Sequence, residues 1–157
     1  MNTTQFSSQL AISFKQMKLS QLHNLVVSSV NENKRREEML IFLNAEKLVG
    51  SNHTNEYDYV MVDTLKSPAA IYDIYNKHND KLVIFDTDKL LQKSYLDIAL
   101  GGFCSSPDSG EKWPVRFNSR KEFLFTGHVI IMTSLSAEDL KKKKVKFKNI
   151  LRDMQIL

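Results

Sequence analysis

Two acidic residues close the most apolar segment of the sequence. Residues 81–88 read KLVIFDTD, so an apolar run ends at Asp86 and Asp88. Such a run, bounded by polar residues, is typical of a buried strand. Carboxylates at the end of a strand in a parallel sheet face the ligand crevice, and an aspartate there can hold Mg²⁺ beside nucleotide phosphates. Asp86 is therefore a candidate magnesium ligand. A strand whose aspartate only caps the next helix is the structural alternative.

The sequence around these acids predicts alternating strands and helices. A helix is expected after YVMVDT, with Ser67 as its cap and Pro68 in its first turn. Another helix is expected over 93–103, and a third begins at Ser136. The expected strands are 59–64, 81–86 and 128–134, with a hairpin over 115–125. This alternation predicts an α/β fold with a largely parallel sheet and flanking helices.

The two ends of the chain predict further elements. Apolar residues recur in steps of three and four over 6–30, which predicts a long helix interrupted near Ser20. The run MLIFL at 39–43 predicts a buried strand. The segment VKFKNILRDMQIL at 145–157 fits a strand or a helix, and we favour a short terminal helix. We therefore expect a single domain over 1–157, with a helical segment at 1–36, an α/β core at 37–140 and a basic segment at 141–157.

Composition favours a cytoplasmic protein without membrane partners. The chain has 157 residues, of which 42% are hydrophobic and 25% charged, as in a single globular domain. Cys104 is the only cysteine, so no internal disulfide forms. Scattered histidines give no zinc spacing, and neither a signal peptide nor a long apolar run is evident. The opening Met1 and first helix lead us to expect a complete chain.

Basic residues gather in three places. One cluster is the run of Lys34, Arg35 and Arg36, and another is the lysine run at 141–144. The third lies in GEKWPVRFNSRKEF, where cations alternate with aromatic residues. Cations bind phosphates and exposed aromatics stack on bases, which predicts nucleic-acid contact. A surface hairpin with its tryptophan packed underneath, and a protein contact, are the alternatives. The predicted nucleic-acid-binding residues are Lys112, Trp113, Arg116, Arg120 and Lys121.

The segment 58–140 resembles the middle of AAA+ type P-loop ATPases, especially those of phages and plasmids. The resemblance is carried by LVIFDTDKLL at 82–91, FLFTG at 123–127 and HVIIMTSL at 128–135. It implies that Asp86 is the Walker B aspartate on the magnesium side. It also implies that Thr133 and Ser134 stand where a sensor residue contacts the γ-phosphate. With Asp88, these residues would form a vestigial Mg-nucleotide site.

The sequence departs from that family in four ways. No GxxxxGK[ST] phosphate loop is present, and Thr87 stands where hydrolytic members carry an acid. The sensor position holds Thr133 or Ser134 in place of asparagine. The interval between the run at 39–43 and the strand at 59–64 is too short for a phosphate loop and its helix. These departures imply a truncated or degenerate P-loop NTPase-like fold.

We therefore expect a non-hydrolysing AAA+ ATPase-like protein that is a structural or nucleic-acid-associated subunit of a DNA-handling assembly. No cofactor is expected, with Mg-ATP as the exception if a residual site survives. Expected partners are nucleic acid and further subunits, either copies of this chain or an active ATPase. The alternatives are a weak ATPase that uses Asp86, and a protein-interaction module that regulates an ATPase ring.

Overall fold

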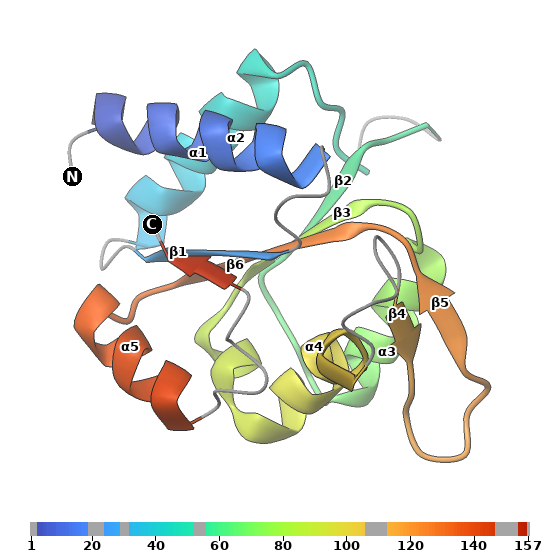
Figure 1. The fold of residues 1–157 in the computed structure, drawn as a ribbon. Helices are drawn as coiled ribbons and strands as arrows, with labels where there is room; N and C mark the ends of the chain where they lie inside the picture. Colours follow the sequence, from blue (N-terminus) through green and yellow to red (C-terminus); the bar gives the residue numbers. More distant parts are fainter. Residues whose placement is uncertain are drawn as a thin grey trace.

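A five-stranded parallel sheet forms the centre of the protein (Figure 1). The computed structural model describes residues 3–18, 24–28, 32–51, 56–105, 113–146 and 154–156. The strand order is β2-β3-β6-β1-β7, and every neighbouring pair is parallel. The predicted α/β fold with a parallel sheet is confirmed. The strands are β2 (Tyr59–Val62), β3 (Leu82–Asp86), β6 (His128–Thr133), β1 (Asn24–Ser28) and β7 (Met154–Ile156).

Helices cover both faces of this sheet (Figure 1). Helices α1 (Thr3–Lys18) and α2 (Glu32–Ala45) lie on one face. Helices α3 (Ala69–Lys77), α4 (Lys93–Ser105) and α5 (Ala137–Lys146) lie on the other, with the short 3-10 helix η1 (Asp88–Leu91) after β3. Alternate strand residues supply two separate cores: Ile84 and Ile130 pack toward α1 and α2, whereas Phe85 and Ile131 belong to the other cluster. None of the helices in the described ranges is long and apolar enough to cross a membrane.

The predicted elements between β2 and α5 are present. At the start of α3, Pro68 has helical dihedral angles (φ −57°, ψ −33°), and no side chain caps the helix, so the predicted Ser67 cap is absent. The Ser136 hydroxyl accepts a hydrogen bond from the Asp139 amide at 3.1 Å, as expected of a helix cap. The predicted hairpin pairs β4 (Trp113–Val115) with β5 (Phe123–Phe125) in antiparallel fashion.

The run at 39–43 lies within helix α2, so the predicted strand is wrong. Met39, Phe42 and Leu43 are buried, whereas Leu40 and Ile41 are 45% and 58% exposed. Burial therefore repeats in steps of three and four, which is the helical period. An unbroken apolar run concealed this because two of its members face away from the core.

Two segments predicted to be helical are strands. Residues 24–28 form β1, which lies between β6 and β7, and Val26 and Val27 are buried on its opposite faces. The predicted helical segment 1–36 is therefore helical at α1 and the start of α2 but contributes an inner strand between them. Near the C-terminus, β7 pairs with β1, Asn24 opposite Met154, where a helix was predicted. Residues 147–153 lie outside the described part.

The hairpin is anchored at the start of β3. The Asn79 carbonyl accepts hydrogen bonds from the Thr126 and Gly127 amides at 2.9 and 3.1 Å. A Cβ on Gly127 would lie 1.9 Å from the carbonyl oxygen of Lys81, so only glycine allows this approach. These contacts fix the register of β6 against β3, with His128 opposite Leu82. The same register determines which residues meet at the far end of the two strands.

Candidate functional site

The carboxyl ends of β1, β3 and β6 meet at one edge of the sheet. Ser28 is opposite Thr133, and Asp86 is opposite Met132, one residue earlier. The chain leaves β1 for α2 on one face of the sheet and leaves β6 for α5 on the other (Figure 1). Neighbouring strands whose connections diverge in this way form a topological switch point, the usual place of a ligand crevice in α/β proteins. The residues predicted for the vestigial Mg-nucleotide site, namely Asp86, Asp88, Thr133 and Ser134, lie at this point.

Asp88 joins the ends of β3 and β6. Its Oδ1 atom accepts hydrogen bonds from the Thr133 hydroxyl at 2.5 Å and from the Ser134 amide at 3.0 Å. Thr133 is fully buried, so its hydroxyl needs this acceptor. The neighbouring Thr87 hydroxyl accepts from the Lys89 amide and caps η1. Three of the residues predicted from the sequence are therefore in direct contact, and Thr87 rather than an aspartate is the cap.

The environment of Asp88 shifts its titration. Partial burial by itself raises the pKa of its carboxyl, but the Thr133 hydroxyl, the Ser134 amide and the nearby Arg35 charge outweigh burial. The pKa therefore lies below the ordinary value of 3.8. Hydrogen bonds to the ionised form favour that form. Asp88 is accordingly an anion throughout the neutral range.

Asp86 is bound by two arginines from the first turns of α2. Its side chain is buried, and its Oδ1 accepts from Arg35 Nε at 2.9 Å. Its Oδ2 accepts from Arg36 Nε at 2.6 Å. Arg35 also donates from Nη1 to the Ser134 hydroxyl at 2.7 Å. We call the connected group the arginine–aspartate cluster; its members are Arg35, Arg36, Asp86, Asp88, Thr133 and Ser134.

The sequence carries Arg35 into the protein on an apolar helix face. Arg35, Met39, Phe42 and Leu43 follow one another at helical spacing, and all of them are buried. Only 2% of the Arg35 side chain is exposed, whereas 34% of the Arg36 side chain is. A buried guanidinium requires a charged partner. Asp86 supplies that charge, and Ser134 supplies a further acceptor.

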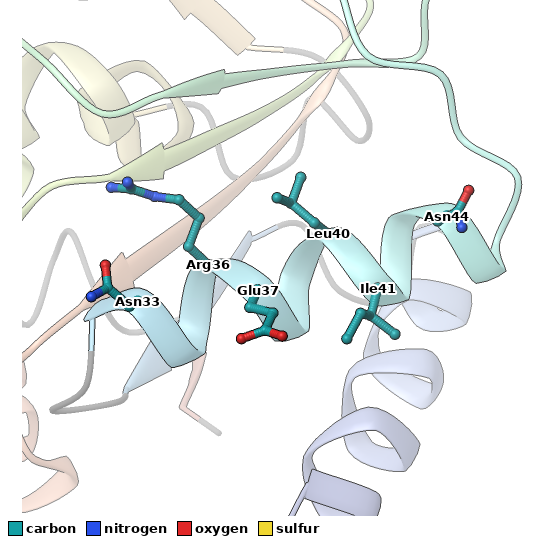
Figure 2. Close-up of a pocket in the computed structure, with 6 residues that line it drawn as sticks. All are labelled: Asn33, Arg36, Glu37, Leu40, Ile41 and Asn44. Carbon is teal, nitrogen blue, oxygen red and sulfur yellow. The ribbon is translucent and has the colours of Figure 1, made fainter.

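Arg36 also borders an open groove along α2 (Figure 2). The groove has a volume of about 430 Å³, and in Figure 2 Arg36 and Leu40 extend from the same side of the helix. Arg36 is therefore reached from the surface, unlike Arg35. The residues that line the groove are Asn33, Arg36, Glu37, Leu40, Ile41 and Asn44.

Neither arginine was predicted as a site residue, although their spacing carried a signal. Residues 28–35 read SSVNENKR, which has the length of GxxxxGK[ST]. Ser28 and Asn33 stand at the glycine positions, Lys34 at the lysine and Arg35 at the Ser/Thr position. The segment begins at the last residue of β1 and ends within the first turns of α2, and a phosphate loop likewise follows a strand and precedes a helix. The interval after residue 43 was the wrong place to look, because 39–43 is not the first strand.

The cluster does not suit the magnesium ion that the family resemblance implies at Asp86. Mg²⁺ takes oxygen ligands in octahedral geometry. Both carboxylate oxygens of Asp86 already accept from guanidinium nitrogens, so a metal ion there would face two like charges. Within the described ranges, no three acidic, histidine or cysteine side chains gather in a way that could hold a metal. The contacts of Asp86 therefore favour an arginine over a magnesium ion as its cationic partner.

The basic hairpin holds its tryptophan inside the protein. Trp113 is 1% exposed and packs on Phe125 with ring centroids 5.0 Å apart, so stacking of Trp113 on a base is excluded and the packed-tryptophan interpretation is confirmed. Arg116 pairs with Glu122. Arg120 pairs with Asp73 at 2.9 Å. Lys121 is exposed, and Lys112 lies outside the described part. The hairpin cations that have carboxylate partners offer less charge to a nucleic acid.

No protein-family model matches this sequence, and the search of curated proteins found no relative. Function must therefore be inferred from the arginine–aspartate cluster and from the spacing of residues 28–35.

The variant Asp86→Asn should lower the free energy of unfolding by about 3–5 kcal/mol, because it leaves buried Arg35 without its compensating charge. The control is Asp97→Asn, which breaks the exposed pair of Asp97 with Lys93 and should change stability by about 0.5 kcal/mol or less. Urea denaturation of the three proteins measures both effects. Similar small losses in the two variants would show that the cluster contributes little.

The variant Asp88→Asn should be less stable than the native protein by an amount that depends on pH. Because the folded pKa lies below 3.8, the native carboxylate stabilises the fold above that pH. This stabilisation is lost as the pH falls through the lower folded value. Urea midpoints measured from about pH 6 to 2.5 should therefore converge toward the acid end. A difference that stays constant over the range would contradict the assigned hydrogen bonds.

Proposed function

We propose that this chain is a non-hydrolysing P-loop ATPase-like domain of the AAA+ type that acts as a structural subunit of a DNA-handling assembly. One observation carries the proposal: Arg35 is bonded directly to Asp86. In P-loop ATPases the phosphate-loop Ser/Thr and the Walker B aspartate hold the same Mg²⁺ ion. Arg35 occupies the first of these positions by spacing, and Asp86 the second by resemblance. Two independent readings of the sequence thus lead to residues that touch.

The surroundings of Asp86 also support this kinship. Asp86 ends an inner strand of a parallel sheet, and β6, whose polar end was compared with a sensor, lies beside it. Asp88, which follows β3, accepts hydrogen bonds from Thr133 and Ser134 at the end of β6. Strand β1, which leads to α2 with the residue spacing of a phosphate loop, lies on the other side of β6. A relative of the P-loop ATPases that has lost its phosphate-binding site would retain each of these features.

Hydrolysis is disfavoured by the side chains in the crevice. Ser28 and Asn33 carry side chains where the loop needs glycines for close approach of its backbone to phosphates. Lys34 stands at the lysine position, and its Nζ atom lies 4.0 Å from Oε1 of Glu38 on the same helix. Thr87, where hydrolytic relatives carry an acid, is a poor general base and caps η1. The steps that bind phosphate and activate water are therefore both weakened.

Charge within the cluster argues in the same direction. The guanidinium groups of Arg35 and Arg36 are balanced by the carboxylates of Asp86 and Asp88. No net positive charge remains in this group to attract a triphosphate. The alternative of a weak Mg-nucleotide-binding ATPase would require Arg35 to leave a buried ion pair. Breaking such a pair costs about 3–5 kcal/mol, which nucleotide binding would have to offset.

Mg-ATP should leave the thermal midpoint of the native protein unchanged. A ligand at concentration c that binds only the folded state stabilises it by RT ln(1 + c/Kd), so about 1 mM nucleotide adds about 1.4 kcal/mol, or several degrees, at a Kd of about 0.1 mM. Differential scanning fluorimetry with Mg-ATP, Mg-ADP and EDTA makes the measurement. A rise of several degrees that disappears in Asp86→Asn would overturn the proposal in favour of a nucleotide-binding protein.

Direct DNA binding by the hairpin should be weak and should vanish between about 50 and 200 mM salt, because Arg116 and Arg120 have carboxylate partners. Fluorescence anisotropy with single- and double-stranded DNA tests this. The double variant Arg116→Ala/Arg120→Ala should lose the residual binding, whereas the control Lys93→Ala should not. Trp113 is the only tryptophan, and its buried ring should keep its emission when DNA is added. Salt-resistant binding with tryptophan quenching would contradict this assignment.

A further inference from the structure

The Arg35 guanidinium connects three separate parts of the fold. It belongs to α2, its Nε binds Asp86 at the end of β3, and its Nη1 binds Ser134 just after β6. Along the chain, Arg35 is separated from Asp86 by 51 residues and from Ser134 by 99 residues. A bound metal ion commonly supplies such a cross-link in a nucleotide site, because its ligands come from several elements. Here one side chain makes the same connections.

We propose that Arg35 replaces the divalent cation of this site and acts as a permanent internal ligand that holds α2, β3 and the end of β6 in one arrangement. This inference rests on the proposed function and specifies how its crevice works. The domain would then keep the same structure whether or not nucleotide is present. A subunit of this kind offers its partners an unchanging surface.

The chemistry of the two arginines fits this role. A guanidinium is always charged and presents its N–H groups in a planar fork, so it can serve a carboxylate and a hydroxyl together. Arg35 and Arg36 also bring two positive charges to Asp86, which is the charge of one Mg²⁺ ion. Unlike a metal ion, neither charge can dissociate from the chain.

Arg36 provides a matched control within the same cluster. Its Nε lies 2.6 Å from Asp86, but its side chain is partly exposed and borders the groove in Figure 2. Loss of Arg36 leaves Asp86 paired with buried Arg35, so the cross-link to Ser134 stays intact. Loss of Arg35 removes that cross-link and frees oxygens of Asp86 and Ser134. The two variants therefore separate the internal ligand from a second, outer cation.

The decisive variant is Arg35→Ser, which removes the guanidinium and places a serine at the Ser/Thr position of the phosphate-loop spacing. We expect its thermal midpoint to be several degrees below that of the native protein in EDTA. We expect MgCl₂ or MnCl₂ alone to recover part of that loss, and Mn²⁺ to bind at least about tenfold more tightly than to the native protein. Arg36→Ser should show no response to metal, and Asp86→Asn added to Arg35→Ser should abolish it. Arg35→Lys, which keeps the charge, should also stay insensitive to metal.

Scanning fluorimetry and Mn²⁺ electron paramagnetic resonance measure these responses. An Arg35→Ser protein that folds and ignores both metals overturns the inference. If Arg35→Ser is unfolded in EDTA, circular dichroism in MgCl₂ gives the test instead, and failure of magnesium to restore the helical signal overturns the inference equally. The proposed function fails separately, through a response of the native protein to Mg-ATP. If the native protein does not respond to Mg-ATP and Arg35→Ser does not respond to either metal, only the replacement of a metal ion by Arg35 is contradicted.

Discussion

Burial of the Arg35 guanidinium is the constraint on which the arrangement of this edge of the protein depends. A charged group with 2% exposure is tolerated only if an opposite charge and further acceptors reach it. Asp86 is equally inaccessible, so each of the two side chains would destabilise the fold without the other. Their pairing fixes the first turns of α2 against the end of β3. Ser134, bonded to both Arg35 and Asp88, fixes the end of β6 in the same place.

The parallel sheet makes this meeting of side chains possible. Parallel neighbours bring all their carboxyl ends to one edge, and the contacts of Asn79 and Gly127 set the register at the opposite edge. A shift of β6 by one residue would turn Ile130 and Ile131 toward the wrong cores and move Thr133 away from Asp88. The polar cluster and the two apolar cores therefore specify the same register. Agreement of this kind between packing and polar contacts favours a single folded state.

Local patterns predicted the half of the fold in which each element has a clear boundary. Strand β3 is fully buried and ends at an acid, β6 ends at Thr133, and α5 has its cap at Ser136, so these elements could be read from the sequence. The sequence grouped Asp86 and Asp88 with Thr133 and Ser134, but only the structure shows that Asp88 binds the two hydroxyl residues while Asp86 binds the arginines. The nucleic-acid role of Trp113 failed because an aromatic residue among charges has the same appearance in sequence whether its ring lies above or below the hairpin.

Strands β1 and β7 and helix α2 were missed for a physical reason that also concealed Arg35. Strand β1 is short, and its apolar residues continue the spacing of α1, while β7 has only three residues and pairs with β1. In α2 the exposed Leu40 and Ile41 fill the gaps of the helical pattern and imitate a buried strand. Once 39–43 is read as a helix, Arg35 falls on its buried face one turn before Met39.

A buried arginine in turn requires a buried acid, and Asp86 is the acid that a parallel sheet places within reach. The same residue was a candidate magnesium ligand because a buried carboxylate at a strand end needs a cation of some kind. Sequence patterns identify that need but not the cation, since a metal ion and a guanidinium satisfy it equally well. The choice is made by the residue that the neighbouring helix carries to the same edge. In this protein that residue is Arg35, whose guanidinium is covalently attached to the chain and cannot dissociate as a metal ion can. The cation at Asp86 is therefore the same whether or not a nucleotide is present.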